Sequence, residues 1–426
     1  MREARKLLGN SSIIFIGTMV GSVFSYIFNT LVGRWLGPSQ YGEFTALMSL
    51  LMIISVGGGA VLTVTMRYSG ELYALKNFQA LRKLFKIFTR YLSFAGVSLF
   101  LVGLIFTKPI AHFFSIEHNV PVIIALFSFI FGFLIVVNKG ILQGTQKFTA
   151  VAFVGTLESL LRLVVGLVLI KVGFQLTGAV LGSVVATIIV YFVTFIPLAK
   201  ILKNKKGQST EFSFDKKEII NYSWPTFMVT LLMAIGLNID VILVKHYFPA
   251  KEAGVYAAIS TIAKIILYTT GPIATVMFPM ISEYKIKGEK HYQLFLFSLL
   301  LTLIGAFLIL GIYYVSPGRI ISLLFGSQYA GSYQLLPQVG FAILLYALVN
   351  IITNYFLSIK NFFFLPFLAI IIGTQIAVIA MWHPSIEAVI KVIISTLGLL
   401  FVLLFCYYLF TKKEQIFSHL RGTNES

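Results

Sequence analysis

A few charged side chains lie inside the long apolar stretches of this sequence. Arg162 is in the middle of one stretch, with Glu158 one helical turn before it, and Lys264 is in the middle of another with no acidic residue within four positions. An ionisable group inside a membrane-spanning helix costs about 2.5–3.5 kcal/mol on insertion scales, so each one requires a partner or a polar cavity. These residues are therefore the first candidates for chemistry.

The spacing of Glu158 and Arg162 has two interpretations. At positions i and i+4 of one helix they can form an ion pair that neutralises both charges and only stabilises packing. Alternatively, Arg162 faces a polar passage, where its planar guanidinium suits phosphate oxygens and Glu158 orients it. Lys264 is too deep to reach the membrane interface easily, so we expect it to line such a passage.

Other polar residues lie in or at the ends of the apolar stretches. Arg34 and Lys391 are near stretch ends, where a long side chain can extend to the interface. Asn238 and Asp240 share one stretch, and for Asp240 two roles stay open: structural hydrogen bonding, or binding of a coupling cation. The sequence around Gly37-Pro38 predicts a turn. Trp35 and Tyr41 beside it are rings typical of a membrane–water boundary.

The elements that position these residues are membrane-spanning helices. Of 426 residues, 58% are hydrophobic and 11% are charged, the mean hydropathy is +0.92, and a soluble domain has about 25% charge. Twelve stretches each supply the roughly 20 apolar residues that a span requires. They lack the alternation of a membrane β-barrel. The sequence therefore predicts an all-α integral membrane protein with about twelve transmembrane helices.

The basic residues indicate an orientation for these helices. The net charge is +18, but the basic residues lie in short joints between apolar stretches, which is a topology signal and not a nucleic-acid surface. If the N-terminus is inside, the inner segments contain 24 Lys and Arg residues and the outer joints contain 5. We therefore predict a multi-pass protein of the cell membrane with both termini in the cytoplasm. The basic stretch from Arg67 to Arg90 is then a candidate contact for membrane lipids.

An internal repeat predicts two similar halves. Gly42 follows a proline and begins the second span, and Gly254, 212 positions later, does the same at the eighth. An even number of spans separates the copies, so the halves should be six-helix bundles related by a parallel pseudo-two-fold axis. The predicted regions are an N-terminal bundle (1–198), a basic cytoplasmic linker (199–218), a C-terminal bundle (219–410) and a cytoplasmic tail (411–426).

The motifs of several enzyme classes are missing from the sequence. No GxxxxGK[ST] phosphate loop and no HExxH zinc motif occurs, and the single cysteine, Cys406, lies in an apolar stretch. A membrane glycosyltransferase would need an extramembrane loop with paired acids, but the longest outer joint, about 316–332, has no Asp or Glu. We therefore expect a protein that is not an enzyme and that uses no cofactor or metal.

Three groups of residues resemble a known family. They are Asn29, Arg34 and Leu36-Gly37-Pro38 with Tyr41-Gly42; Gly140-Ile-Leu-Gln-Gly-Thr-Gln-Lys-Phe148; and Asn238-Ile-Asp240 with Gly254-Val-Tyr256. The pattern is similar to the polysaccharide-exporter branch, with its O-antigen-type flippases, of the multidrug/oligosaccharidyl-lipid/polysaccharide (MOP) superfamily. The resemblance extends over the first eight spans and implies a MATE-like fold.

The resemblance also implies a function and a site. Members of this branch flip polyprenyl-diphosphate-linked oligosaccharide to the outer leaflet by alternating access, for cell-surface polysaccharide biosynthesis. The partners expected here are that lipid, with its anionic diphosphate, membrane lipids, and polysaccharide polymerase or assembly proteins. The candidate substrate-binding residues are Arg34, Arg162, Lys264, Glu158, Asn29 and Asn238, and Asp240 is the candidate for a coupling ion.

Two other functions compete with the flippase. A multidrug cation antiporter of the same superfamily would need acids alone in its passage, and Lys264 argues against that. A scaffold of a polysaccharide-assembly complex that transports nothing would not need deep charges beside a cavity.

Overall fold

The computed structural model describes residues 2–202, 216–287 and 291–422, without the side chains of 2–15, 216–223, 286, 330 and 413–422. Most of the predicted linker and the end of the predicted tail lie outside these ranges. The helices are α1 (Arg2–Ala74), α2 (Phe78–Ile105), α3 (Thr107–Phe113), α4 (Val120–Gly144), α5 (Phe148–Leu169), the π-helix η1 (Ile170–Phe174), α6 (Gln175–Leu202), α7 (Lys216–Tyr247), α8 (Ala250–Ala263), α9 (Ile265–Lys287), α10 (Tyr292–Val315), α11 (Pro317–Phe325), the 3₁₀ helix η2 (Ser327–Ser332), α12 (Leu335–Ser358), α13 (Leu365–Met381) and α14 (Ile386–Gly422).

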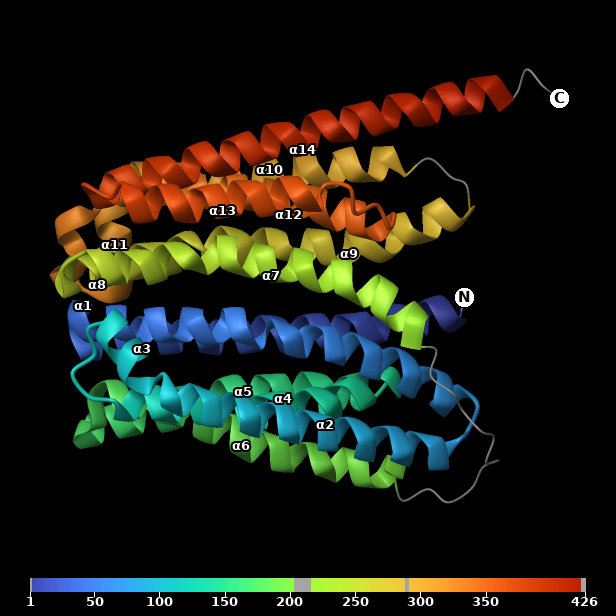
Figure 1. Cartoon of the computed structure of the whole chain (residues 1–426), viewed down its shortest axis with the longest axis horizontal. Helices are drawn as coiled ribbons and strands as arrows, with labels where there is room; N and C mark the ends of the chain where they lie inside the picture. Colours follow the sequence, from blue (N-terminus) through green and yellow to red (C-terminus); the bar gives the residue numbers. More distant parts are fainter. Residues whose placement is uncertain (1, 203–215, 288–290, 423–426) are drawn as a thin grey trace. The chain divides into compact units, whose positions relative to one another are not determined.

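The protein is an all-α integral membrane protein. Within the described residues there is no β-strand, and nine helical stretches are long and apolar enough to cross a membrane. Two of these stretches, α1 and Phe148–Leu202, each reverse direction once and so contain two arms (Figure 1). The 17-residue α13 is a further apolar helix. Their arrangement as twelve spans in two six-helix bundles stays a prediction.

The reversal in α1 occurs at the predicted turn. Gly37 has φ 75° and ψ 173°, a conformation that only glycine adopts readily, and Pro38 then begins the second arm. Trp35 is 41% exposed, as expected for an interfacial ring. The same expectation for Tyr41 is wrong, because its ring is fully buried and lies 6.4 Å from that of Phe44. It is a packing residue of the second arm.

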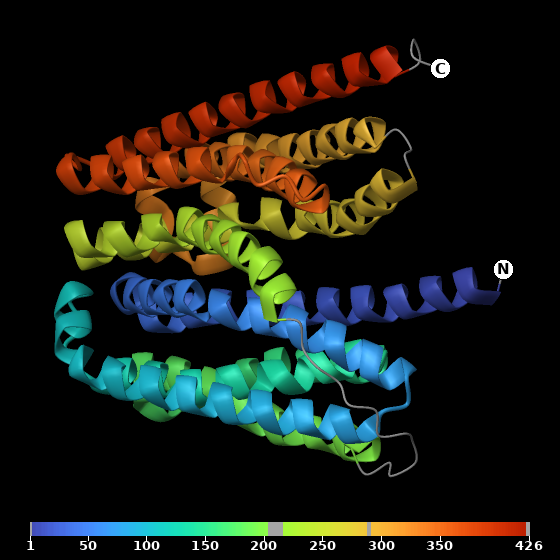
Figure 2. The same ribbon diagram turned by 45° about the vertical axis from the view of Figure 1, so that its right-hand side comes forward.

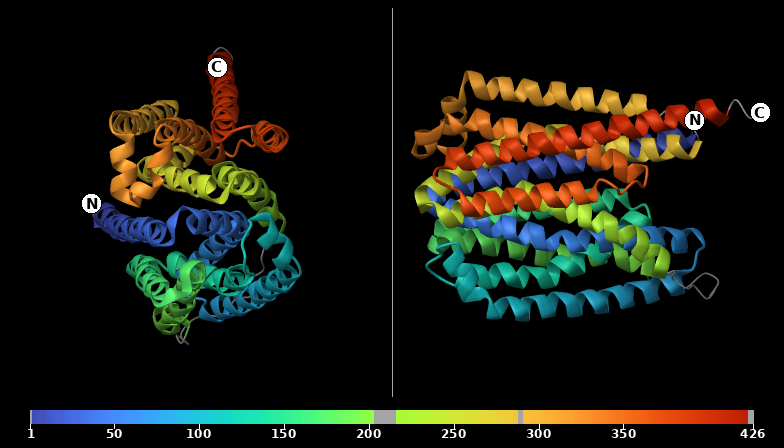
Figure 3. Two further views of the ribbon diagram at one scale, coloured as in Figure 1. Left: turned by 90° about the vertical axis from the view of Figure 1, so that its left-hand side faces the viewer. Right: turned by 45° about the horizontal axis from the view of Figure 1, so that its top comes forward.

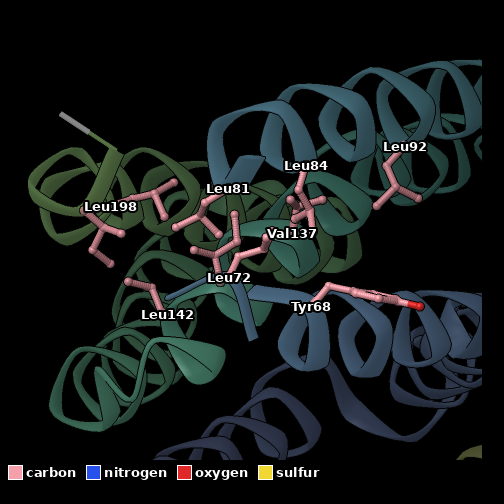
Figure 4. Packing of buried hydrophobic residues seen from close by; sticks show 10 residues of the cluster. Tyr68, Leu72, Leu81, Leu84, Leu92, Val137, Leu142 and Leu198 are labelled. Atoms are coloured by element: carbon pink, nitrogen blue, oxygen red, sulfur yellow. The ribbon is translucent and has the colours of Figure 1, made fainter. Parts of the chain in front are cut away.

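The chain forms two compact units, residues 1–227 and 228–426. In the first unit α1 packs on α4 and α5, α2 packs on α4, and α6 packs on α4 and α5. Figure 2 shows the dark blue first arm of α1 and its lighter second arm within this unit. A buried apolar cluster at one end joins α1, α2, α4 and α6, and Figure 4 shows Leu72, Leu81 and Leu142 close together in it.

The two ends of the first unit differ in charge. The α1–α2 and α4–α5 joints lie at the same end as the N-terminus (Figure 1) and contain Lys76 and Lys147. The opposite end contains the two reversals and α3, with Arg34, Lys108 and Lys171. With the stretch from Arg67 to Arg90 added, the N-terminal end is the more basic one. The topology rule would place that end in the cytoplasm.

In the second unit α12 is the central helix. It packs on α8, α9, α10 and α14, and 83% of its most apolar window is buried. The helix α13 packs on α14, the long red helix in Figure 3. One apolar stretch of this unit, Ala250–Lys285, is interrupted at Lys264, which lies between α8 and α9. The break places the deepest lysine of the sequence analysis at a helix junction.

Candidate functional site

The first unit holds a group of polar side chains that we call the first charge cluster: Lys139, Glu158, Arg162 and Thr187. The Lys139 Nζ lies 2.7 Å from Glu158 Oε2, and their side chains are 26% and 21% exposed. Thr187 Oγ1, from α6, donates to Glu158 Oε1 at 3.4 Å. Glu158 therefore joins three helices, α4, α5 and α6, through its two oxygens.

The ion pair between Glu158 and Arg162, one of the two interpretations of their spacing, is not formed. In the part of the chain that the structure describes, the ion-pair partner of Glu158 is Lys139, because the α4–α5 hairpin brings Lys139 beside it. Arg162 is half-buried one turn further along α5, and its charge still acts on the carboxylate. One acid is thus shared by two cations, which leaves the first charge cluster with one net positive charge.

Neutral hydrogen bonds attach the first arm of α1 to this part of α5. Ser25 Oγ donates to Ser159 Oγ at 3.2 Å, and Thr156 Oγ1 donates to the Gly17 carbonyl at 3.0 Å. Asn29 is half-buried, and its amide donates to the Ser25 carbonyl at 2.8 Å, four residues back on its own helix. The described contacts therefore bring Asn29 near α5 but not into the first charge cluster.

The second unit holds the second charge cluster: Asn238, Asp240, Tyr256, Ser260 and Lys264. Lys264 Nζ donates to Asn238 Oδ1 at 3.3 Å. Asp240 Oδ2 accepts from Tyr256 at 2.7 Å and from Ser260 at 3.5 Å. Among the described residues no carboxylate pairs directly with Lys264, although the charge of Asp240 acts on it. The lysine is held by an amide, and the acid by two hydroxyls.

One oxygen of Asp240 has no hydrogen-bond partner in the described part of the chain. The side chain is 6% exposed, and its Oδ1 is buried. A small cavity of about 10 Å³, the space of one water molecule, lies beside it and is lined by residues of α7, α8, α12 and α14, including Gly236, Tyr346 and Ile393. The carboxylate thus has unused capacity next to an open space.

The remaining predicted residues lie apart from both clusters. Arg34 is exposed at the reversal of α1, and Lys391 is exposed near the N-terminal end of α14. Both positions suit side chains that extend to the interface. The structure therefore brings together Glu158 and Arg162 in the first unit and Asn238, Asp240 and Lys264 in the second, and it leaves Arg34 and Asn29 outside.

Sequence reasoning missed four members of the two clusters. Lys139 was counted as a joint residue, but it lies five positions inside α4. Thr187 carries no sequence signal of its own. Tyr256, Ser260 and Lys264 recur every four residues in an apolar stretch, so they share one helix face. That polar stripe is the signal that could have identified Tyr256 and Ser260.

The comparisons with known proteins agree with this architecture. The family described as "Polysaccharide biosynthesis protein" matches residues 7–285. No curated protein matches the sequence significantly.

Solved structures with the same fold are similar over nearly the whole chain. One is described as the lipid II flippase MurJ in an inward closed conformation: 17% identity, 94% of this chain and 87% of that chain covered, TM-score 0.71. A second is an inward-facing multidrug resistance MATE family transporter of the MOP superfamily: 12% identity, 92% and 97% covered, TM-score 0.74. A third is a MOP superfamily transporter from Pyrococcus furiosus, described as having a binding pocket of reverse polarity: 14% identity, 93% and 95% covered, TM-score 0.60.

These likenesses confirm the MATE-like fold that the sequence predicted. The family match covers well over half of the chain, including all of α1 to α6 except the first residues of α1. The chain therefore belongs to the polysaccharide biosynthesis protein family.

Proposed function

We propose that this protein is a flippase for a lipid-linked oligosaccharide. Its substrate is an oligosaccharide on polyprenyl diphosphate, which it moves from the inner to the outer leaflet by alternating access, for the synthesis of a cell-surface polysaccharide. The family membership supports the pathway class. The fold, shared with structures described as a flippase and as transporters, supports the transport mechanism.

The observation that carries this proposal is the excess of basic groups deep in the membrane helices. The two charge clusters contain three cations, Lys139, Arg162 and Lys264, and two acids. Each deep charge is costly in a bilayer, so an uncompensated cation needs a function. A diphosphate supplies the missing negative charge, and the guanidinium of Arg162 matches its oxygens in a bidentate geometry.

A membrane potential can drive this movement without ATP. Moving one charge across 100 mV is worth about 2.3 kcal/mol, so two net negative charges moving outward gain roughly 4–5 kcal/mol. The gain is smaller if protein cations cross the field with the substrate. A coupling cation bound at Asp240 would then contribute driving force. The Asp240 oxygen without a hydrogen-bond partner supports that assignment.

The test is a flipping assay in proteoliposomes with the full chain, a polyprenyl-diphosphate oligosaccharide and a potassium-diffusion potential. We expect flipping to accelerate when the donor side is negative and to slow when the sign is reversed. Protein-free vesicles are the control. Equal rates at both signs, without dependence on sodium or proton gradients, would mean that the protein only facilitates flipping and that neither the potential nor an ion gradient drives it. Complete absence of flipping would refute the flippase and favour the scaffold.

The same assay separates the flippase from a cation antiporter. An antiporter would exchange organic cations for sodium or protons and would ignore the diphosphate lipid. The excess of basic groups argues against it, because a cationic passage repels a cationic drug.

The orientation is a further part of the proposal. Ser39 is exposed at the reversal of α1 and Ser385 in the α13–α14 joint, and we assign each of these positions to the outside; Gln146 is exposed in the α4–α5 joint, which we assign to the inside. In a background without Cys406, single cysteines at the first two positions should react with an impermeant thiol reagent on intact cells. A cysteine at Gln146 should react only after permeabilisation. The reverse labelling pattern would mean that the assigned orientation is wrong.

A further inference from the structure

Glu158 makes its strongest contact with a side chain that the proposed transport would require to be available. Its carboxylate lies 2.7 Å from the amine of Lys139, within hydrogen-bonding distance. The two residues come from different helices, α4 and α5, and are 19 positions apart in sequence. Lys139 is therefore not available to bind an anion while this pair is intact.

The pair is partly open and not sealed in the bundle. About a quarter of the Lys139 side chain and a fifth of the Glu158 side chain are exposed, at 26% and 21%. Exposed charges at this depth are unfavourable against acyl chains, so their open side must face water. An ion pair beside water can exchange partners, in contrast to a fully buried pair, which would leave an uncompensated charge.

The rest of the first charge cluster supports Glu158 after such an exchange. Thr187 donates to its other oxygen at 3.4 Å, and Arg162 acts on it electrostatically from one turn away. If the Lys139 amine turns to an incoming anion, the carboxylate keeps a hydrogen-bond donor and a nearby cation. After the exchange Glu158 therefore keeps a hydrogen bond at Oε1 and a cation nearby, which limits the cost of releasing Lys139.

We infer that Glu158 is an internal substitute for substrate phosphate, which occupies Lys139 in the unloaded protein and releases it to the diphosphate. This inference rests on the proposed function and assigns a new task to two residues. Lys139 is a substrate-binding residue that the sequence reasoning missed. Glu158 is a positioning residue that competes with the substrate and so weakens binding.

Competition of this kind requires a ligand that offers Lys139 more than the carboxylate does. A monophosphate offers Lys139 little more than the carboxylate already offers. A diphosphate carries more charge and more acceptor oxygens, and it can contact Arg162 and Lys139 together. Glu158 therefore keeps the diphosphate from binding so tightly that release is slow, and a monophosphate, which gains less from Lys139, binds only weakly.

The test measures the affinity of the full-length protein in nanodiscs for two probes, polyprenyl diphosphate and polyprenyl monophosphate. Glu158→Gln should bind the diphosphate roughly tenfold more tightly than the wild type. Its affinity for the monophosphate should rise by no more than that factor, because the cost of freeing Lys139 from Glu158 is the same for both lipids, and turnover in the flipping assay should slow. Lys139→Gln should weaken diphosphate binding, and the double variant should resemble Lys139→Gln.

A matched control is available in the same unit. Glu71→Gln breaks the i,i+4 pair with Arg67, whose atoms are 3.2 Å apart and whose side chains are 52% and 44% exposed near the end of α1. This variant should bind both probes like the wild type. Glu158→Asp keeps the charge but shortens the side chain, and its affinity should lie between those of the wild type and Glu158→Gln.

The outcomes separate the inference from the function on which it rests. If the wild type binds the diphosphate and both Glu158 variants bind it equally or more weakly, the pair is purely structural and the inference is wrong. A diphosphate affinity unchanged in Lys139→Gln would also refute it. If the wild type binds neither probe and flips nothing, the proposed function fails first.

Discussion

The two units hold a deep lysine by different contacts. In the first unit Lys139 contacts a carboxylate directly, at 2.7 Å. In the second unit Lys264 contacts the neutral oxygen of Asn238 at 3.3 Å, while the nearby Asp240 is hydrogen-bonded to Tyr256 and Ser260. An ion pair neutralises its lysine, but an amide only solvates it. Lys264 therefore carries the less compensated charge, and its loss should be felt most strongly in transport.

The largest expected effect is that of Lys264→Glu. Reversing the charge would place two carboxylates, the new one and Asp240, near each other in the second charge cluster and repel an anionic substrate. We expect polymer export to be abolished while the amount of protein in the membrane stays nearly unchanged. Lys391→Glu, at an exposed position near the start of α14, is the control and should export normally. Full export by the Lys264 variant would remove this residue from the mechanism.

The next effect concerns packing at glycine. In the first unit α1 and α4 approach closely at glycine: a Cβ on Gly144 would lie 2.0 Å from Ser69 Oγ and 2.3 Å from the Met66 carbonyl. The second unit joins α9 and α12 by a hydrogen bond from Ser282 to the Ser358 carbonyl at 3.0 Å. Gly144→Ala should therefore lower the free energy of unfolding by about 1–3 kcal/mol, as overpacking does.

Gly132→Ala is the matched control on the same helix. A Cβ there meets no atom within 4 Å, so the substitution should be neutral or stabilise by up to about 1 kcal/mol through helix propensity. Thermal unfolding of the detergent-solubilised variants provides the comparison. Equal losses at both positions would mean that the close helix contact is unimportant for stability.

An effect of similar size is expected from the hydroxyls of the second unit. Tyr256→Phe removes the hydrogen bond to Asp240 and should cost about 1.5–3 kcal/mol, because the acceptor is charged. Tyr313→Phe removes a bond of the same length, 2.7 Å, to the neutral Ile262 carbonyl, and should cost about 0.5–1.5 kcal/mol. If the order is reversed, the hydrogen bond from Tyr256 to Asp240 stabilises the fold no more than a bond to a neutral carbonyl does.

The smallest effect is expected from the first charge cluster. Thr187→Val removes a donor that lies 3.4 Å from Glu158. The carboxylate keeps its contact with Lys139, so stability should fall by less than about 1 kcal/mol. A loss of stability as large as that of Tyr256→Phe would mean that the carboxylates of the two clusters depend equally on hydroxyl donors, although only Glu158 also contacts a lysine.

Local sequence patterns predicted the helical architecture well. The apolar stretches, the turn at Gly37 and the polar pair Asn238 and Asp240 are visible in short windows, because helix formation and membrane insertion depend mainly on neighbouring residues. The reversal in α1 occurs where the sequence predicted it. The motifs around Arg34 and Gly254 were enough to identify the superfamily.

Contacts between helices could not be predicted in the same way. Glu158 has an arginine four residues away, but it pairs with Lys139, which reaches it across the α4–α5 hairpin. Tyr41 is a residue type typical of the membrane interface, but its ring is buried because the face of the second arm of α1 that carries it packs against the protein. In both cases the partner is fixed by helix rotation and register, which a single sequence does not contain.

The interruption at Lys264 has a consequence for biosynthesis in the membrane. The stretch Ala250–Lys285 has a window hydropathy of 1.5, compared with 2.9 for Val120–Gly144. Ten of the fourteen residues of α8 are buried against protein, including Tyr256 and Ser260. A segment of this low hydropathy gains little free energy from contact with lipid alone, so its insertion by the translocon depends on neighbouring helices. Its insertion depends on α7, whose Asn238 and Asp240 accept hydrogen bonds from its amine and its hydroxyls.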